Sequence, residues 1–233
     1  MKLFYDLHIH SCLSPCGDDQ NTPGNIAGML KLAGVEIAAL TDHNTCMNCR
    51  PFIEHAEGHG IIALPGMELT TSEEVHVVCL FGDIEAAEGF SRYVYPSVPK
   101  IKNNPQIFGN QFYIGPDDEI TGVEDKLLIS ATGIGIYKIC GLVESYGGVA
   151  FPSHIDRPAF SLLSNLGIWD DAMGFNFYER SARPNLAVLP PKPFLINSDA
   201  HCLEDIADAM NSLEVQARSA KAVIEALRAL RIT

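Results

Sequence analysis

The chain has 233 residues, of which 47% are hydrophobic, so it can bury the core of one α/β barrel or one large α/β sheet. A formal net charge of −13, with only 16 lysine and arginine residues, makes long nucleic acid a poor expected partner. No apolar run approaches the roughly 18 residues of a membrane span, so no membrane partner is expected. The seven cysteines and the lack of a recognisable secretory leader favour reduced thiols in a cytoplasmic enzyme.

Strand-like and helix-like runs alternate through the first half of the chain. Thr22 is suited to cap a helix that begins with Pro23, and Gly34 is suited to end it. In chain order the pattern predicts a strand over 2–9, a helix over 23–33, a strand over 35–41, a helix over 51–59, strands over 61–67 and 75–81, and a helix over 85–93.

Residues 95–126 interrupt this rhythm with four prolines and a turn-forming Gly-Pro-Asp-Asp run. We interpret them as an insertion near the mouth of the site, within a single domain that spans 1–233. Six or seven βα units favour a TIM-like barrel, although the same rhythm fits an open doubly wound sheet. The pattern after the insertion predicts a helix over 133–146, a strand over 148–153, a short helix over 160–166, strands over 172–179 and 194–198, a helix from Leu203, and a helix over 219–230 after the segment 212–215.

Six of the eight histidines lie at or near the ends of strand-like runs, together with acidic residues. Because the C-terminal ends of parallel barrel strands meet on one face, residues placed there can build one metal site. His55 and His59 are spaced as in a helical zinc motif but lack the glutamate that such a motif needs, so we expect them on a solvated helix face. The candidate residues are His8, His10, Asp42, His43, Glu68, His76, His154, Asp199 and His201.

The pair His8-x-His10 gains meaning from strand geometry. Side chains two residues apart on a strand point to the same face, so these two imidazoles can share one ion. Asp199-x-His201 repeats the spacing. Asp42 is placed to orient a ligating imidazole from behind, as carboxylates commonly do in metal sites.

The ordered motifs HxH, TDH, GMEL, two further histidines and DAH resemble the PHP family of polymerase-and-histidinol-phosphatase-like metal phosphoesterases, over roughly residues 5–201. The resemblance implies a distorted (β/α)7 barrel with two or three divalent metal ions, of zinc, iron or manganese, at the C-terminal ends of the strands. It implies ligands His8, His10, Glu68 and Asp199 for a first metal, Glu68, His76 and His154 for a second, and His43 and His201 for a third.

The third metal of the family usually has one more ligand, a His or Asp several residues after the HxH motif. Here Pro15 stands where some relatives have Asp. By position Cys16 is the best candidate, and Asp18 is the alternative. A thiolate at this place would favour zinc or iron over manganese or magnesium.

Together these features predict a metal-dependent phosphoesterase that hydrolyses a small phosphorylated substrate with a hydroxide activated by the metal ions. Arg157 follows His154 on a loop and is the candidate clamp for the phosphoryl group, with a salt bridge to Asp156 or to another surface acid as its structural alternative. Protonation of the leaving group is expected from His201 or from water on the metal. Weaker candidates for substrate contact are Lys100, Lys102, Arg180 and Arg183.

Other functions fit parts of the same pattern. One is a nuclease or exonuclease that acts on nucleotides or short oligonucleotides. Another is a non-catalytic metal or redox sensor, in which Cys12, Cys16, Cys46 and Cys49 hold a metal or an iron–sulfur cluster. An amidohydrolase-like barrel is disfavoured because no lysine lies at a strand end between the histidine motifs. Neither the substrate nor the oligomeric state follows from the sequence.

Overall fold

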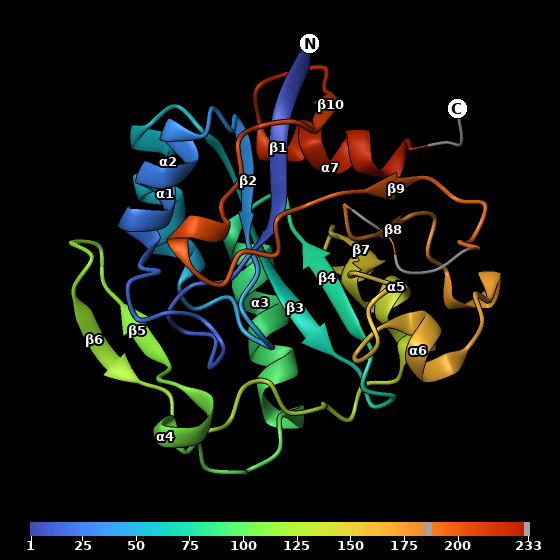
Figure 1. Cartoon of the computed structure of the whole chain (residues 1–233), viewed down its shortest axis with the longest axis horizontal. Helices are drawn as coiled ribbons and strands as arrows, with labels where there is room; N and C mark the ends of the chain where they lie inside the picture. The colour runs from blue at the N-terminus through green and yellow to red at the C-terminus, as the bar shows by residue number, and fades with distance from the viewer. Residues whose placement is uncertain (183, 185–187, 231–233) are drawn as a thin grey trace.

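The computed structural model describes residues 1–182, 184 and 188–230 and shows an α/β fold built on one six-stranded sheet of order β10-β1-β2-β3-β4-β7 (Figure 1). The strands are β1 (Lys2–Ile9), β2 (Ile37–Leu40), β3 (Ile62–Thr70), β4 (His76–Leu80), β5 (Phe112–Ile114), β6 (Ile120–Val123), β7 (Val149–Pro152), β8 (Tyr178–Glu179), β9 (Phe194–Leu195) and β10 (Ser212–Glu214). The helices are α1 (Pro23–Leu32), α2 (Cys49–Gly58), α3 (Ile84–Val94), α4 (Pro105–Phe108), α5 (Ile136–Ser145), α6 (Leu162–Leu166) and α7 (Ala220–Arg228), with 3-10 helices at Tyr95–Ser97, Asp171–Met173 and Leu203–Asp205.

The sheet is mixed. Strands β1, β2 and β3 are parallel, whereas β4 runs antiparallel to both β3 and β7, and β10 runs antiparallel to β1. The parallel pair β8 and β9 lies beside β7, and the chain after β9 returns to β1 through a bridge between Ile9 and Ala200. The strands therefore curl into part of a barrel, which confirms the predicted TIM-like α/β class. The antiparallel strands β4 and β10 were not part of the prediction.

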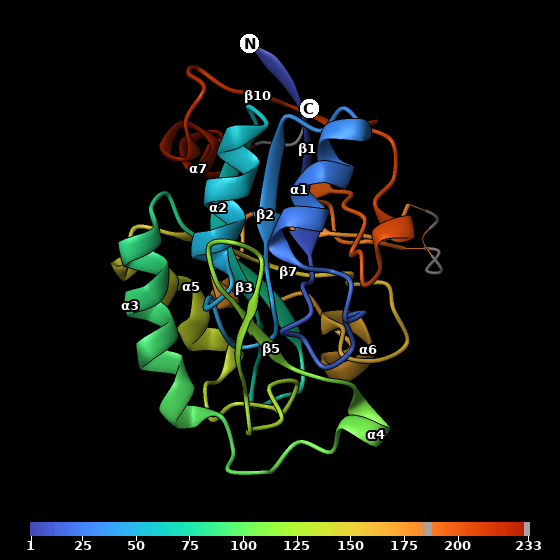
Figure 2. The ribbon, with the colours of Figure 1, turned by 90° about the vertical axis from the view of Figure 1, so that its left-hand side faces the viewer.

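Alternation along the strands fills a hydrophobic core on each face of the sheet. In β2, Ile37 and Ala39 join the core that α7 covers, whereas Ala38 and Leu40 join the core that α1, α2, α3 and α5 cover. Figure 2 shows α1, α2 and α3 along one side and α7 apart from them. Because both faces are covered, β2 reads in the sequence as a continuous apolar run.

Two predicted strands and one predicted helix are much shorter in the structure. In the predicted strand 172–179, alternate residues from Met173 to Phe177 are buried, but only β8 has a hydrogen-bonded partner strand. In the predicted strand 194–198, the backbone beyond β9 forms hydrogen bonds with side chains and, among the described residues, not with a neighbouring strand. Ser198 donates its backbone N–H to the carboxylate of Asp6, and the carbonyl of Ile196 accepts from the side chain of Asn211. The helix predicted from Leu203 is a single 3-10 turn.

The insertion at 95–126 folds as the short helix α4 and the hairpin of β5 and β6, which stands beside α1 and α2 (Figure 2). Asp118, at its tip, accepts hydrogen bonds from the hydroxyl of Thr22 and from the backbone N–H of Gly24, at the start of α1. The hairpin also packs on the loop before α1, since Phe112 donates to the carbonyl of Cys12. No helix of the described residues is long and apolar enough to cross a membrane.

We expect Asp118→Gly to lower the free energy of unfolding by about 1–2 kcal/mol, because it removes the carboxylate that holds the hairpin to the start of α1. Glycine tolerates the left-handed backbone of this position (φ 63) and so isolates the loss of the side chain. Urea denaturation measures the effect. The matched control is Asp117→Gly at the exposed neighbouring position, and an equal loss in both variants would contradict the docking role.

Candidate metal centre

The carboxylate of Glu68, in β3, is the hub at which five imidazoles meet. Its oxygens lie between 3.1 and 3.4 Å from one ring nitrogen of each histidine. Oδ1 of Asp199 adds a further oxygen, 3.2 Å from Nε2 of His8 and 3.3 Å from Nε2 of His10. The structure thus brings together, in one buried cluster, Glu68, Asp199, His8, His10, His43, His76 and His154.

Most of these side chains reach the hub from strand ends, but two do so differently from the prediction. His76 begins β4, and because β4 is antiparallel to β3, it pairs with Thr70, the last residue of β3. Its strand therefore starts at the edge where the neighbouring parallel strands end. The expectation that every candidate follows the C-terminal end of a strand is wrong for His76, and also for Glu68, which lies inside β3.

Hydrogen bonds behind the imidazoles determine which ring nitrogen faces the hub. Nδ1 of His8 lies 2.9 Å from a carboxylate oxygen of Glu179, and because a carboxylate accepts, Nδ1 carries the proton. Nδ1 of His10 donates to the hydroxyl of Ser14 at 2.9 Å, since that hydroxyl itself donates to Asp42 at 2.7 Å. In the neutral rings both Nε2 atoms therefore point lone pairs into the hub.

Lone pairs that face each other at short range repel unless a positive charge lies between them. The Nε2 atoms of His8 and His10 are 3.1 Å apart. Nitrogen ligands of one tetrahedral zinc ion, each about 2.1 Å from it, are about 3.4 Å from one another. Among the described residues, both ring nitrogens of His76 and Nδ1 of His43 are buried without a hydrogen-bond partner. The donor set therefore fits divalent cations.

The electrostatics of the cluster lead to the same conclusion. Burial opposes a charge on His8, but Asp199, Glu179 and Glu68 outweigh it and hold the pKa of His8 well above its ordinary value. Burial also opposes a charge on His10, but its contacts with Asp199 and Glu68 outweigh burial and raise the pKa of His10 to about 9. Burial likewise opposes the charge of Glu68, yet the surrounding histidines hold its pKa well below the ordinary value. The cluster thus stabilises positive charge, which bound cations would supply.

The donor atoms form three contiguous groups, each compact enough for one ion. Neighbouring groups share a residue, as expected for ions that lie close together. The carboxylate of Asp42 accepts from the hydroxyls of Ser11 and Ser14, so it acts behind His10. The groups are His8 with His10 and Glu68, His43 with Glu68 and His76, and His10 with Cys16, His43 and His201.

Cys16 belongs to the third group, whereas Asp18 does not. The carboxylate of Asp18 accepts from the backbone of Gln20 within its own loop. Nδ1 of His201 donates to the carbonyl of Asp199 at 2.8 Å, which leaves Nε2 as a lone-pair donor. Burial, followed by the charge of His10, lowers the pKa of His201 to about 4, so the ring is neutral at pH 7. A neutral ring favours a ligand role for His201 over the predicted proton-donor role.

The alternative of a four-cysteine site has no support in the geometry. Cys46 and Cys49 are buried in the hydrophobic core that α2 covers, and the Cys49 thiol contacts backbone carbonyls of Leu40 and Gly66. Among the described residues, Cys16 is the one thiol found in a group of potential metal ligands. The paired-thiol spacing therefore arises from packing.

Arg157 lies where two cavities of about 290 Å³ meet, since both are lined by His154, Arg157 and Asp199. Its Nη1 is 2.6 Å from Oδ2 of Asp199, and its side chain is 44% exposed. Of the predicted alternatives, a salt bridge to Asp156 is absent among the described residues, and Arg157 instead pairs with the buried Asp199. Arg180 lines one of the two cavities, whereas Arg183 lies outside the described residues.

Glu179 is a functional candidate that the sequence analysis missed. It is buried at the end of β8, bonded to the His8 ring, to the backbone N–H of His154 and, at 2.7 Å, to the side chain of Asn197. It therefore links two of the imidazole-bearing segments. The available signal was its position, an acidic residue at the end of a predicted strand, which is the pattern that identified Glu68.

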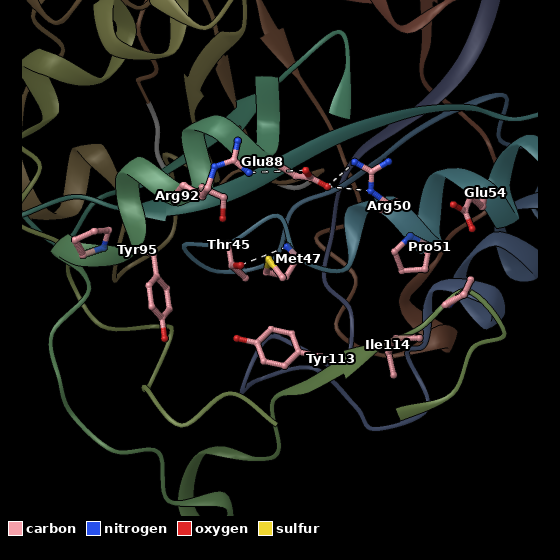
Figure 3. A pocket seen from close by; sticks show the side chains of 13 residues that line it. Thr45, Met47, Arg50, Pro51, Glu54, Glu88, Arg92, Tyr95, Tyr113 and Ile114 are labelled. Atoms are coloured by element: carbon pink, nitrogen blue, oxygen red, sulfur yellow. Dashed lines mark hydrogen bonds and ion pairs between the residues drawn. The ribbon is translucent and has the colours of Figure 1, made fainter. Parts of the chain in front are cut away.

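A larger cavity, about 820 Å³, lies away from the hub, between α2, α3 and the insertion (Figure 3). Met47, Tyr95 and Tyr113 line it, and Arg50 and Arg92 both approach Glu88 at its edge. Its size does not make it the reaction site, because no group of potential metal ligands among the described residues lines it.

The sequence profile of the PHP domain matches residues 6–168, and that of the PHP-associated region matches residues 190–232. A comparison with curated proteins gives no significant match. Among solved structures, a lesion-specific endonuclease Q from Pyrococcus furiosus superposes with a TM-score of 0.70 at 19% identity, over 99% of this chain and 56% of the other. This chain thus spans little more than half of that protein.

Two further solved structures share the fold. Endonuclease Q in complex with a 27-mer duplex with an abasic lesion has a TM-score of 0.65 at 18% identity, over 100% of this chain and 58% of the other. A protein of Bifidobacterium adolescentis, described as a metal-dependent phosphoesterase, has a TM-score of 0.60 at 19% identity, over 84% of this chain and 87% of the other.

The expectation that long nucleic acid is a poor partner is wrong, because a protein with this fold is solved on duplex DNA.

We expect Glu68→Gln to retain less than half of the metal that the wild-type protein binds, because the hub loses the charge that balances the cations. Elemental analysis of the purified protein measures this. Cys46→Ala and Cys49→Ala are the controls and should keep the wild-type metal content. Full metal in Glu68→Gln, or loss of metal in either cysteine variant, would contradict the assignment of the hub.

Glu179→Gln should weaken metal binding by about 10- to 100-fold, since it replaces the charged acceptor that fixes the His8 ring. Competition with a chelator of known affinity measures this. The matched control is Glu144→Gln on the exposed side of α5, which should behave as wild type. Unchanged affinity in Glu179→Gln would show that Asn197 and the local backbone suffice to hold the ring.

Proposed function

Because the chain belongs to the PHP family of metal-dependent hydrolases, we propose that it hydrolyses phosphate esters with two or three divalent cations held around Glu68. The observation that carries this proposal is the contact of Arg157 with Asp199. It sets a half-exposed guanidinium, a good partner for phosphoryl oxygens, directly beside the cluster of metal-binding donors.

The donor types suit zinc, iron or manganese, and the thiol of Cys16 favours zinc or iron at the third group. When bound, such cations lower the pKa of water, polarise phosphoryl oxygens and neutralise charge on the leaving oxygen. The residues that would hold them are His8, His10, Cys16, His43, Glu68, His76, His154, Asp199 and His201.

The protein's own side chains bind and orient the substrate. Arg157 offers the N–H groups not directed at Asp199 to the phosphoryl oxygens. Glu179, Ser14 and the carbonyl of Asp199 keep protons on the outer ring nitrogens, so the inner nitrogens stay available as donors. This fixed arrangement is needed because small misplacements of reacting groups reduce rates strongly.

We propose a small phosphate ester as the substrate, since the cavity of about 290 Å³ at the hub is near the lower limit of small-molecule sites. The second candidate is a nuclease. It is favoured by the likeness to endonuclease Q and by the second cavity beyond Arg157, because a phosphodiester carries organic groups on both sides of its phosphate. The free cysteines fit a cytoplasmic location, which stays a proposal.

A panel of phosphomonoesters, phosphodiesters and an abasic-site duplex, assayed with and without chelator, tests the proposal. We expect cation-dependent release of phosphate or alcohol from at least one of them. If the protein has full metal content but hydrolyses none of these compounds, the proposed hydrolase activity is contradicted and a non-catalytic metal-binding role is favoured.

Arg157→Ala should lower kcat/KM for the best substrate by about 10²-fold, because one preorganised cationic donor is lost from the developing charge. Metal content should stay at the wild-type level. The matched control is Arg218→Ala, which removes an equally exposed arginine paired with Glu36 at another surface. Wild-type kinetics in Arg157→Ala would show that this arginine only balances the charge of Asp199.

A further inference from the structure

The cavity at the hub has an apolar wall beside the metal-binding donors. Ile129, Pro158, Ala159 and Phe160 line it together with the candidate ligands. Phosphate itself gains nothing from such a wall, because apolar groups cannot bond its oxygens. The wall therefore faces the organic part of whatever ester enters the cavity.

Phe160 is the residue of this wall with a defined orientation. Its ring stacks on the imidazole of His76, with centroids 5.0 Å apart and an angle of 18° between the planes. Its carbonyl accepts the backbone N–H of His76 at 3.0 Å, which ties the residue to the start of β4. Stacked on one side and bonded through its backbone, the ring is held in place.

Phe160 is nevertheless 41% exposed, although His76, on which its ring stacks, is buried. Its backbone is left-handed (φ 53), which is uncommon for a bulky residue and costs free energy. Shielding of His76 alone would be achieved by an aliphatic side chain without an exposed aromatic face. The position thus holds an aromatic side chain that its neighbours orient and that is partly open to solvent.

One loop presents the ring together with the other site groups. His154, Arg157 and Phe160 follow each other at intervals of three residues. The backbone N–H of Arg157 bonds to the carbonyl of His154 at 2.9 Å, and the hydroxyl of Ser161 bonds to the carbonyl of Arg157 at 2.7 Å. A metal-binding imidazole, an anion clamp and an aromatic surface are therefore set by the same turn.

We propose that Phe160 is a specificity-determining residue, whose outer face stacks on a planar unsaturated group joined to the phosphate of the substrate. This rests on the proposed phosphoesterase function and narrows its substrate class. Nucleobases and aryl leaving groups share the required chemistry, since both offer a flat π surface. A saturated sugar or alkyl ester has no such surface and gains only apolar contact.

The test measures binding with probes that the enzyme does not hydrolyse, by titration calorimetry of the metal-loaded full chain. Phenylphosphonate should bind about 10- to 100-fold more tightly than methylphosphonate, as expected for one stacked ring. Phe160→Leu should reduce that preference to less than about threefold and leave methylphosphonate affinity and metal content unchanged. Phe160→Tyr should restore the preference. The matched control is Phe108→Leu on α4, where the phenylalanine is 42% exposed.

Equal weakening of both probes in Phe160→Leu, or loss of metal from it, would overturn the proposal, because Phe160 would then serve only to position His76. A second pair, the non-hydrolysable phosphonate analogues of a nucleoside 5′-monophosphate and of ribose 5-phosphate, separates the two sources. An effect in the nucleotide pair alone indicates a nucleobase, and an effect in the phenyl pair alone indicates an aryl ester. If the wild-type protein hydrolyses no ester, the proposed function fails, but the binding preference still decides the role of Phe160.

Discussion

The structure depends on one buried carboxylate. Glu68 is 1% exposed, and burial of an uncompensated charge costs several kcal/mol. Five imidazoles surround it, and they come from the end of β1, from the loops after β2 and β7, and from the start of β4. Each of these segments must therefore reach the same point within a few tenths of an ångström. The antiparallel direction of β4 meets this requirement, because it places His76, the first residue of β4, at the edge of the sheet where the parallel strands end.

Unfavourable backbone conformations are concentrated around the same point. Asn44, His154, Phe160 and Asp199 all have positive φ, and each lies in or directly beside the cluster. For residues other than glycine this conformation costs on the order of 1–3 kcal/mol and persists only where the surroundings enforce it. Here the enforcing contacts are specific: Asn44 bonds to the carbonyls of Leu128 and Ser130, and His154 bonds to Glu179. These backbone conformations thus lower local stability while they orient the side chains of the cluster.

The sequence named the residues that the structure gathers around Glu68, but it did not give several of their geometries. The pairing of His8 with His10 follows from the period of two in an extended chain, whereas Asp199 has a left-handed backbone, so that period does not explain Asp199-x-His201. Cys16 was suggested by its position after the HxH motif. The antiparallel course of β4 could not be read, because an apolar run carries no direction. The apparent strand at 172–179 shows the same limit, since Met173, Phe175 and Phe177 alternate in burial without pairing to a neighbour. Glu179 was visible as an acidic residue at a strand end but had no histidine beside it to draw notice.

The error about nucleic acid has a physical origin in the scale of electrostatic interactions. The net charge of −13 sums over the whole surface, but exposed charges separated by more than about 10 Å are largely screened at ordinary salt. Recognition of a phosphate depends on the charges within that range. At the hub the proposed positive charges are those of Arg157 and of cations that the donors would hold, and they would offset the carboxylates of Glu68 and Asp199. A chain that binds phosphate mainly through metal ions has no need of a basic surface, and the acidic residues that hold those ions make its formal charge more negative.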